Sequence, residues 1–178
     1  MRKASGFTLV ELVVVIVIVG LLAVAALPKF LDVTDEAKKA SIEGVAGGFA
    51  TAVLSARAQW EAEARPKNTS GSNSVNYDGT TFLLTSSSNS GFRDGYPIAL
   101  DNGSGSDSSA TSSSCRDLMD ELLQNPPQVA VVGSTTSDSN YSAEAINSGE
   151  CRYTQLEGTT GHYFTYDVNT GRVTVSLQ

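Results

Sequence analysis

The chain has 178 residues, of which 40% are hydrophobic and 17% are charged, a length that accommodates a membrane helix and one small domain. Nineteen acidic and twelve basic residues give a formal net charge of −7 at pH 7, and acidic residues predominate after position 65. This composition lacks the basic footprint of an extended nucleic-acid-binding surface and excludes that class of function for the C-terminal region.

An apolar run extends from Phe7 to Leu27 and contains a single charge, at Glu11. As a helix, about twenty residues at 1.5 Å each span roughly 30 Å, the thickness of the hydrocarbon core of a bilayer. We therefore expect a membrane-spanning helix. A carboxylate inside such a helix costs on the order of 2.5–3.5 kcal/mol at mid-membrane and less near an edge. Because no other side chain in the run is ionisable, Glu11 requires a partner from elsewhere.

The residues before the run suggest the source of that partner. Arg2-Lys3 favours the cytoplasmic side, so the rest of the chain is directed outward. The small residues Ala4-Ser-Gly6 precede the apolar run, whereas the cleavage site of an ordinary secretory signal follows it. Cleavage after Gly6 would keep the helix and expose an amino group on Phe7, which could neutralise Glu11 of a neighbouring copy. The alternative is a simple anchor in which Glu11 is a tolerated charge near the membrane edge.

The string Gly6-Phe-Thr-Leu-Val-Glu11-Leu, followed by apolar residues, Gly20 and Pro28, resembles the class III signal of type IV pilins. The motif is specific, although the resemblance covers only the N-terminal segment. It implies cleavage between Gly6 and Phe7 by a membrane prepilin peptidase and N-methylation of Phe7. It also implies polymerisation into a helical filament with Glu11 in the core.

Three strings are similar to the mannose-sensitive haemagglutinin (MSHA) branch of these pilins. They are Glu11-Leu-Val-Val-Val-Ile-Val-Ile-Val-Gly20, Pro28-Lys-Phe-Leu-Asp32 and Gly95-Tyr-Pro-Ile98. We therefore expect the chain to be closest to that branch.

The helix is expected to continue beyond Pro28 as an amphipathic helix that stops at Arg65-Pro66, because proline disfavours helical geometry in the residue before it. The predicted organisation is a leader over residues 1–6, a membrane and filament-core helix over 7–28, its amphipathic continuation over 29–65, and a head over 66–178. The apolar positions recur in steps of three to five and comprise Phe30, Val33, Ala37, Ala40, Val45, Phe49, Val53, Ala56 and Trp60.

Gly20 and Pro28 bracket a weak region of this helix. Pro28 removes the hydrogen bond to the carbonyl of Val24 and clashes with it, at a cost of about 3 kcal/mol in a helix interior. We expect a helix break between Gly20 and Pro28, by bending or local melting, once subunits enter a filament. The glycines at 44, 47 and 48 predict either a second flexible point or a merely curved helix.

In the head, loops rich in Ser, Thr, Gly, Asn and Asp are predicted over residues 67–76, 86–91, 101–114 and 133–140. Strands are predicted over residues 80–85, 129–132, 151–156, 162–168 and 172–177, with Asn169-Thr-Gly171 as the last turn. Aromatic residues at 163, 164 and 166 place rings on both faces of the fourth of these strands. The predicted fold class is α+β, with the long N-terminal α-helix packed against one C-terminal antiparallel β-sheet, as in the type IV pilin fold.

A short helix is predicted over residues 115–124. Ser114 is its expected cap, Asp117 completes a capping box, and the sequence Asn125-Pro-Pro127 ends it. Its buried side is predicted to consist of Leu118, Met119, Leu122 and Leu123.

Cys115 and Cys151 are the two cysteines of the chain. In an exported protein an even pair indicates a disulfide formed in the periplasm, which would bound the region 115–151. A loop of this size would stabilise the head by about 4 kcal/mol in the chain-entropy account. Metal binding is the alternative, although no CxxC pair accompanies these cysteines.

Few head residues suggest chemistry. His162 is the single histidine, beside Tyr163, and we expect it to be structural or exposed. No G-x-S-x-G motif or Ser/His/Asp constellation is recognisable, so we expect neither enzymatic activity nor a cofactor. Residues 101–107 are similar in composition to a calcium loop but lack its D-x-[DN]-x-[DN]-G pattern and its acidic twelfth position, so we expect a flexible loop and no metal.

The resemblance implies a structural subunit that polymerises into a type IV pilus, with attachment as its role and motility as an open question. The implied partners are other copies of the chain, the prepilin peptidase, the assembly platform and cytoplasmic ATPases. The implied location is the inner membrane, as a single-pass, N-in protein, and then the extracellular pilus.

Two alternatives stay open. One is a type II secretion pseudopilin, although the cysteine pair argues against the major pseudopilin, which typically relies on a calcium loop. The other is a minor or tip pilin that binds carbohydrate or DNA.

Overall fold

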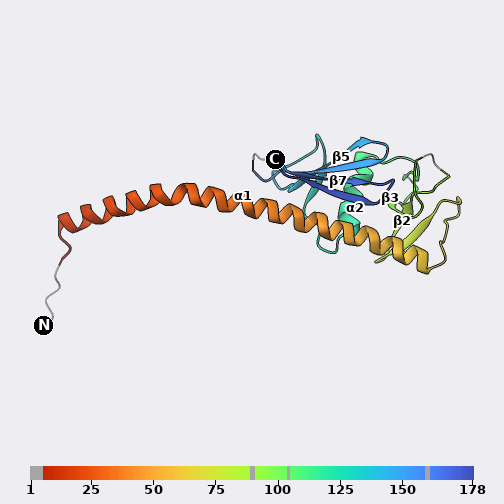
Figure 1. Ribbon diagram of the computed structural model, residues 1–178, viewed down its shortest axis with the longest axis horizontal. Coiled ribbons are helices and arrows are strands. Elements are labelled where there is room, and N and C mark those ends of the chain that lie inside the picture. The colour runs from red at the N-terminus through yellow and green to blue at the C-terminus, as the bar shows by residue number, and fades with distance from the viewer. Residues whose placement is uncertain (1–5, 89–90, 104, 159–160) are drawn as a thin grey trace. The chain divides into compact units, whose positions relative to one another are not determined.

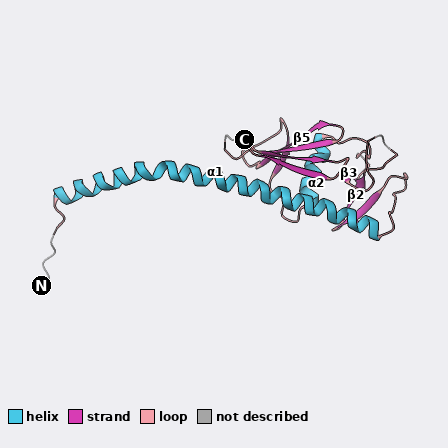
Figure 2. Ribbon diagram, viewed as in Figure 1, coloured by secondary structure: helices cyan, strands magenta, loops and turns pink. Residues whose placement is uncertain are grey.

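The computed structural model describes residues 6–88, 91–103, 105–158 and 161–178, and only the backbone at positions 31 and 32. Leader residues 1–5, including Arg2 and Lys3, lie outside this part. Helices and strands follow one another as shown in Figures 1 and 2. They are α1 (Leu9–Ala62), β1 (Ser74–Tyr77), β2 (Thr80–Leu84), β3 (Pro97–Leu100), α2 (Ser112–Leu122), β4 (Val129–Val131), β5 (Tyr141–Asn147), β6 (Glu150–Gln155), β7 (Tyr163–Asp167) and β8 (Arg172–Ser176). The predicted α+β class is confirmed.

The chain divides into two compact units, residues 1–39 and residues 40–178. In the first unit, α1 is long and apolar enough to cross a membrane. An 18-residue stretch of the helix has a mean hydropathy of 3.1, and 0% of that stretch is buried. Its backbone is helical through both Gly20 and Pro28. The helix break expected between these two residues concerns the filament and stays a prediction.

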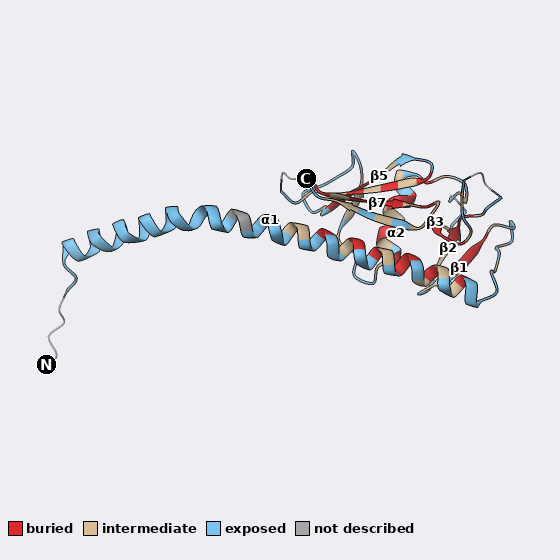
Figure 3. Cartoon of the chain, in the orientation of Figure 1, coloured by how far each residue is buried: buried red, intermediate tan, exposed pale blue. Residues whose placement is uncertain are grey.

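In the second unit, one face of α1 is buried, as the red positions in Figure 3 show. The prediction of an amphipathic helix holds here, but the predicted positions were partly wrong. Phe30, Val33 and Ala37, which lie in the first unit, are exposed, and so is Ala40, whereas Val45 is half-buried. Because the helical period is 3.6, the buried face advances in alternating steps of three and four rather than in steps of five. The residues on this line are Ile42, Ala46, Phe49, Val53, Ala56 and Trp60, and Ala52 beside it is also buried.

The helix ends at Ala62, slightly before the predicted stop at Arg65-Pro66. Ala64 and Arg65 adopt positive φ values of 63° and 61°, which breaks the helical path before the proline is reached. The indole Nε1 of Trp60 donates to the carbonyl of Pro66 at 3.0 Å and ties the chain reversal to the core.

The head contains two sheets, whereas one was predicted. β1, β2 and β3 form a three-stranded antiparallel sheet, and β4 to β8 form a five-stranded sheet in chain order. Within the second sheet β4 pairs parallel to β5, and the other pairs are antiparallel. Antiparallel pairing therefore dominates, as expected, but the first sheet and the parallel edge were not anticipated.

Five predicted strands are confirmed as β2, β4, β6, β7 and β8, and three strands were missed. β1 lies partly within the stretch predicted as a loop over 67–76, because its polar residues have a turn-like composition. Asp78 and Gly79, at φ 50° and 91°, form the tight turn that pairs β1 with β2. β5 reads YSAEAIN, and its alanines and glutamate are poor strand formers in isolation.

The short helix exists, but its predicted cap was wrong. α2 begins at Ser112, and Thr111 is its N-cap. The Thr111 side chain accepts a hydrogen bond from the Ser114 N–H at 3.1 Å, and the Ser114 hydroxyl accepts one from the Thr111 N–H at 2.9 Å. Asp117 instead accepts from the Arg116 side chain at 2.9 Å, outside the capping box. Of the predicted buried side, Leu118, Met119 and Leu122 are buried and Leu123 is half-buried.

The core joins α1 to the five-stranded sheet through aromatic rings. The Phe49 ring centroid lies 5.4 Å from that of Tyr153, 5.8 Å from Phe164 and 5.3 Å from Tyr166. The hydroxyl of Tyr153 donates to the Cys115 carbonyl of α2 at 2.7 Å. That of Tyr166 donates to the Pro97 carbonyl at 2.8 Å, which links the two sheets.

The predicted disulfide is confirmed. Cys115 of α2 and Cys151 of β6 are bonded, with Cα atoms 5.6 Å apart, and both residues are fully buried. The bond closes a loop over a sequence separation of 36 residues, for which the chain-entropy account gives a stabilisation of about 4 kcal/mol.

Candidate assembly site

The start of α1 brings together Thr8 and Glu11. The Glu11 Oε2 atom accepts a hydrogen bond from the Thr8 backbone N–H at 2.9 Å and another from the Thr8 hydroxyl at 2.7 Å. The Glu11 N–H in turn donates to the Thr8 hydroxyl at 3.3 Å. This is a capping box, in which Thr8 is the N-cap and Glu11 the third helical residue. The position of Glu11 in the first turn also suits the positive end of the helix dipole.

Sequence reasoning missed the role of Thr8. The string Thr8-Leu-Val-Glu11 has the spacing of a capping box, and that signal would have found the contact. The donors of Thr8 are neutral, so an expectation based on ionisable partners of Glu11 does not include them.

The expected cleavage position lies directly before this box. Gly6, Phe7 and Thr8 precede the helix, and Phe7 is 79% exposed. A Cβ at Gly6 would meet no atom within 4 Å. The peptide bond between Gly6 and Phe7 therefore lies in open, non-helical chain. The structure brings Glu11 together with Thr8, and among the described residues Glu11 forms no hydrogen bond or ion pair with Phe7.

The first half of α1 presents a continuous apolar surface. Between Leu9 and Leu27 every described side chain is exposed, including Ile16 at 59% and Leu21 at 69%. Contiguous exposed apolar surface of this extent indicates a membrane or another protein chain as its environment. Glu11 is the one carboxylate on this stretch.

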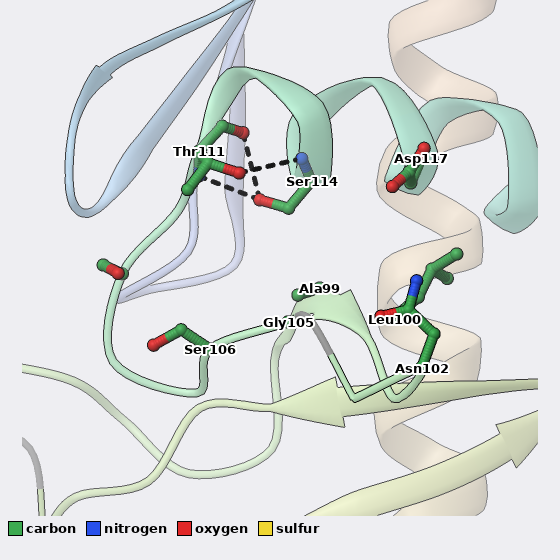
Figure 4. Close-up of a pocket in the computed structure, with 9 residues that line it drawn as sticks. Ala99, Leu100, Asn102, Gly105, Ser106, Thr111, Ser114 and Asp117 are labelled. Atoms are coloured by element: carbon green, nitrogen blue, oxygen red, sulfur yellow. Dashed lines mark hydrogen bonds between the residues drawn. The ribbon is translucent and has the colours of Figure 1, made fainter.

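The head contains a small cavity of about 80 Å³ between the end of β3 and the start of α2, shown in Figure 4. Its hydroxyls at Thr111 and Ser114 are already used in the capping box of α2. At Gly105 a Cβ would overlap the Leu100 carbonyl, so the wall is close-packed backbone. The cavity therefore follows from local packing at the start of α2.

Two further candidates for chemistry were His162 and the loop over residues 101–107, and in each a polar side chain is hydrogen-bonded within the head. His162 is fully buried, and its Nδ1 atom accepts the Gln178 N–H at 2.9 Å, which holds the chain just after β8. In the loop considered for calcium, the Asp101 Oδ2 atom accepts from the Asn68 side chain at 3.0 Å. Within the described residues, no group of three His, Cys, Asp or Glu side chains could hold a metal ion.

Comparison with known proteins bears on the N-terminal segment. Residues 1–27 match the family described as the prokaryotic N-terminal methylation motif. The chain is 44% identical over 57 residues to the type IV narrow pilus major component PilA5 of Thermus thermophilus, which is 32% of this chain and 49% of the relative. The chain thus matches about half the length of this curated relative. No solved structure matches. The N-terminal segment therefore carries the N-terminal methylation motif, and the chain is similar over 57 residues to a type IV pilin.

Proposed function

We propose that the chain is a type IV pilin, a structural subunit rather than an enzyme, which polymerises into a pilus filament. The observation that carries this proposal is one carboxylate, Glu11, at the start of an exposed apolar helix within the segment that matches the methylation motif. Such a helix needs other helices or lipid around it, and such a carboxylate needs a cation.

The proposed assembly chemistry uses three residues. A prepilin peptidase cleaves between Gly6 and Phe7, and the new amino group of Phe7 is methylated. In the membrane this amine pairs with Glu11 of an adjacent copy. The attraction is strong because the apolar surroundings screen charges poorly, and an unpaired carboxylate there is costly.

The same proposal covers location and partners. The subunit is a single-pass, N-in protein of the inner membrane before assembly and part of an extracellular pilus afterwards. The assembly platform and cytoplasmic ATPases drive extension, and the helix yields between Gly20 and Pro28 as subunits pack. Attachment to surfaces is the proposed role of the polymer, and the MSHA branch is supported by the Glu11–Gly20, Pro28–Asp32 and Gly95–Ile98 strings alone.

The proposal is tested by Glu11→Gln, which keeps the side-chain shape and removes the charge. We expect the variant to lose its leader normally but to yield filaments at least about tenfold below wild type. The free-energy cost of leaving one charge unneutralised in the membrane exceeds about 1.4 kcal/mol, which corresponds to a tenfold change in an equilibrium constant. Sheared surface filaments are quantified by electron microscopy and gel, and mass spectrometry reports leader loss and methylation of Phe7.

Glu43→Gln is the matched control, because Glu43 is an exposed carboxylate farther along the same helix. It should assemble normally. Wild-type filament yield from Glu11→Gln would contradict the proposal. Counting copies per filament in the same sheared material distinguishes a major subunit from a minor tip subunit, and a pseudopilin would give no surface filaments.

A further inference from the structure

We propose that Thr8 is a positioning residue that directs Glu11 towards the amine of another copy by preventing the pairing of Glu11 with the amine of its own chain. This inference rests on the proposed function. Glu11 can bind either the Phe7 amine of its own chain or that of another copy. The charges of the carboxylate and the amine do not by themselves decide between these two partners.

The first step is the geometry of the capping box. Both bonds from Thr8, at 2.9 Å and 2.7 Å, reach the same carboxylate oxygen, Oε2 of Glu11. Within the described residues, no hydrogen bond to the second oxygen, Oε1, is recorded. Since a carboxylate can accept about four hydrogen bonds, Oε1 keeps its full capacity for an incoming cation.

The second step concerns where the helix begins. An N-cap residue has non-helical geometry, and α1 begins at Leu9, so Thr8 ends the helical path and Phe7 lies beyond it. If the helix instead ran through Phe7, residues 7 and 11 would be separated by four positions and would lie on the same helix face. Cleavage would then create an amine one turn away from the carboxylate of its own chain.

The third step is competition for Glu11. The capping box uses only atoms of Thr8 and Glu11, so cleavage between Gly6 and Phe7 leaves it intact. While the box is closed, the Thr8 N–H and hydroxyl both bond to Oε2 of Glu11, so the amine of the same chain would have to displace them to bind that oxygen. A pair within one chain neutralises the charge without recruiting a second subunit, whereas the closed box leaves both the amine and Oε1 available to other copies.

The test uses three substitutions at position 8 in the full-length chain. Thr8→Val keeps the shape and removes the capping hydroxyl, whereas Thr8→Ser and Thr8→Asn keep a side-chain oxygen that caps a helix. We expect Thr8→Val to be cleaved and methylated but to yield filaments about tenfold below wild type, the change that corresponds to loss of one N-cap. The Ser and Asn variants should assemble within about twofold of wild type, since these residues cap about as well as threonine.

Thr34→Val is the matched control on the same helix. The Thr34 hydroxyl donates to a backbone carbonyl, that of Phe30, at 2.9 Å, so its loss should leave filament yield unchanged. A second readout is the pH titration of the N-methyl signal of processed subunits in detergent micelles, followed by NMR. In Thr8→Val the amine should titrate at higher pH than in wild type, and Glu11→Gln in the same chain should remove that shift.

The outcomes separate the two proposals. If Glu11→Gln blocks assembly while Thr8→Val assembles as wild type, the positioning role is overturned and the proposed function stands. Failure of cleavage in Thr8→Val, or equal loss of filaments in the Ser and Asn variants, also overturns it, because the capping oxygen would then not be the determinant. If Glu11→Gln itself assembles normally, the proposed function fails first.

Discussion

At the scale of single residues, the turn between β7 and β8 depends on the absence of one side chain. Gly171 lies in this turn at φ 71°, and a Cβ there would overlap the ring of Tyr96. Tyr96 is held in place by the Arg57 guanidinium, which lies 4.4 Å from the ring centroid. The predicted turn thus also packs against the chain just before β3. The residues Asn169-Thr-Gly171 themselves do not predict that contact.

Gly171→Ala should therefore destabilise the protein more than an alanine at another left-handed glycine. Gly133 is the matched control, because its φ is 83° but a Cβ there would meet no atom within 4 Å. Both variants bear the backbone strain, and only Gly171→Ala adds the overlap, which typically costs 1–3 kcal/mol when a packed region must shift. Thermal unfolding of the full-length protein in detergent measures the difference. Equal losses in both variants would show that the Tyr96 ring moves aside freely.

At the scale of elements, the start of α2 shows what local sequence leaves ambiguous. The run Thr111-Ser-Ser-Ser114 contains four residues that can each cap a helix. The Ser114 and Asp117 pair has the sequence signature of a capping box, yet the structure uses Thr111 and Ser114. Starting three residues earlier places Ser112 where its hydroxyl accepts the Ala145 N–H of β5 at 3.0 Å. A contact with a distant strand thus accompanies the choice between two local solutions.

Thr111→Ala should cost about 1 kcal/mol of stability, the usual effect of losing an N-cap. Ser113→Ala is the control in the same first turn, since Ser113 is exposed and lies outside the capping box. We expect that control to remain within about 0.5 kcal/mol of wild type, as surface substitutions usually do. Chemical denaturation followed by circular dichroism compares the two. A larger loss for Ser113→Ala than for Thr111→Ala would contradict the observed cap.

At the scale of the whole molecule, buried tyrosines make folding sensitive to alkali. Tyr153 and Tyr166 are fully buried, and burial raises the pKa of each phenol well above its ordinary value of 10.0. Burial, with the nearby Glu157 charge, raises the pKa of Tyr141 to about 12. The folded chain therefore keeps protons that the unfolded chain releases above its own pKa, so the stability due to these groups is complete below that value and is lost above it.

We expect the contribution of these three tyrosines to the free energy of unfolding to stay constant up to about pH 10. It should then fall as the pH rises towards about 12. Denaturant titrations at a series of pH values measure this fall, and tyrosinate absorbance follows the ionisation. Tyr166→Phe removes one of the groups and should make the fall shallower, although it also loses the bond to the Pro97 carbonyl and begins from a lower stability. Unchanged stability between pH 10 and 12 would refute this account.

The confirmed predictions are those that rest on strong local signals in the sequence. The apolar run from Phe7 to Leu27 was recognisable because its length and composition alone suit a bilayer. The motif around Gly6, Phe7 and Glu11 was recognisable because it depends on the spacing of a few residues within one short stretch of sequence. β7 and β8 were found because aromatic and β-branched residues flank a clear turn. β1, β3 and β5 were missed because their own composition does not favour a strand. They are strands because they pair with neighbouring strands.

By itself, the sequence determined the apolar N-terminal helix, its single acidic residue, the head rich in short strands and the cysteine pair, because each depends on residue chemistry or on periodicity within one element. Tertiary structure alone decided that the head has two sheets, that β4 runs parallel to β5, and that Thr111 caps α2. These features arise from contacts between residues far apart in the chain, where several local solutions have similar free energies and packing selects one.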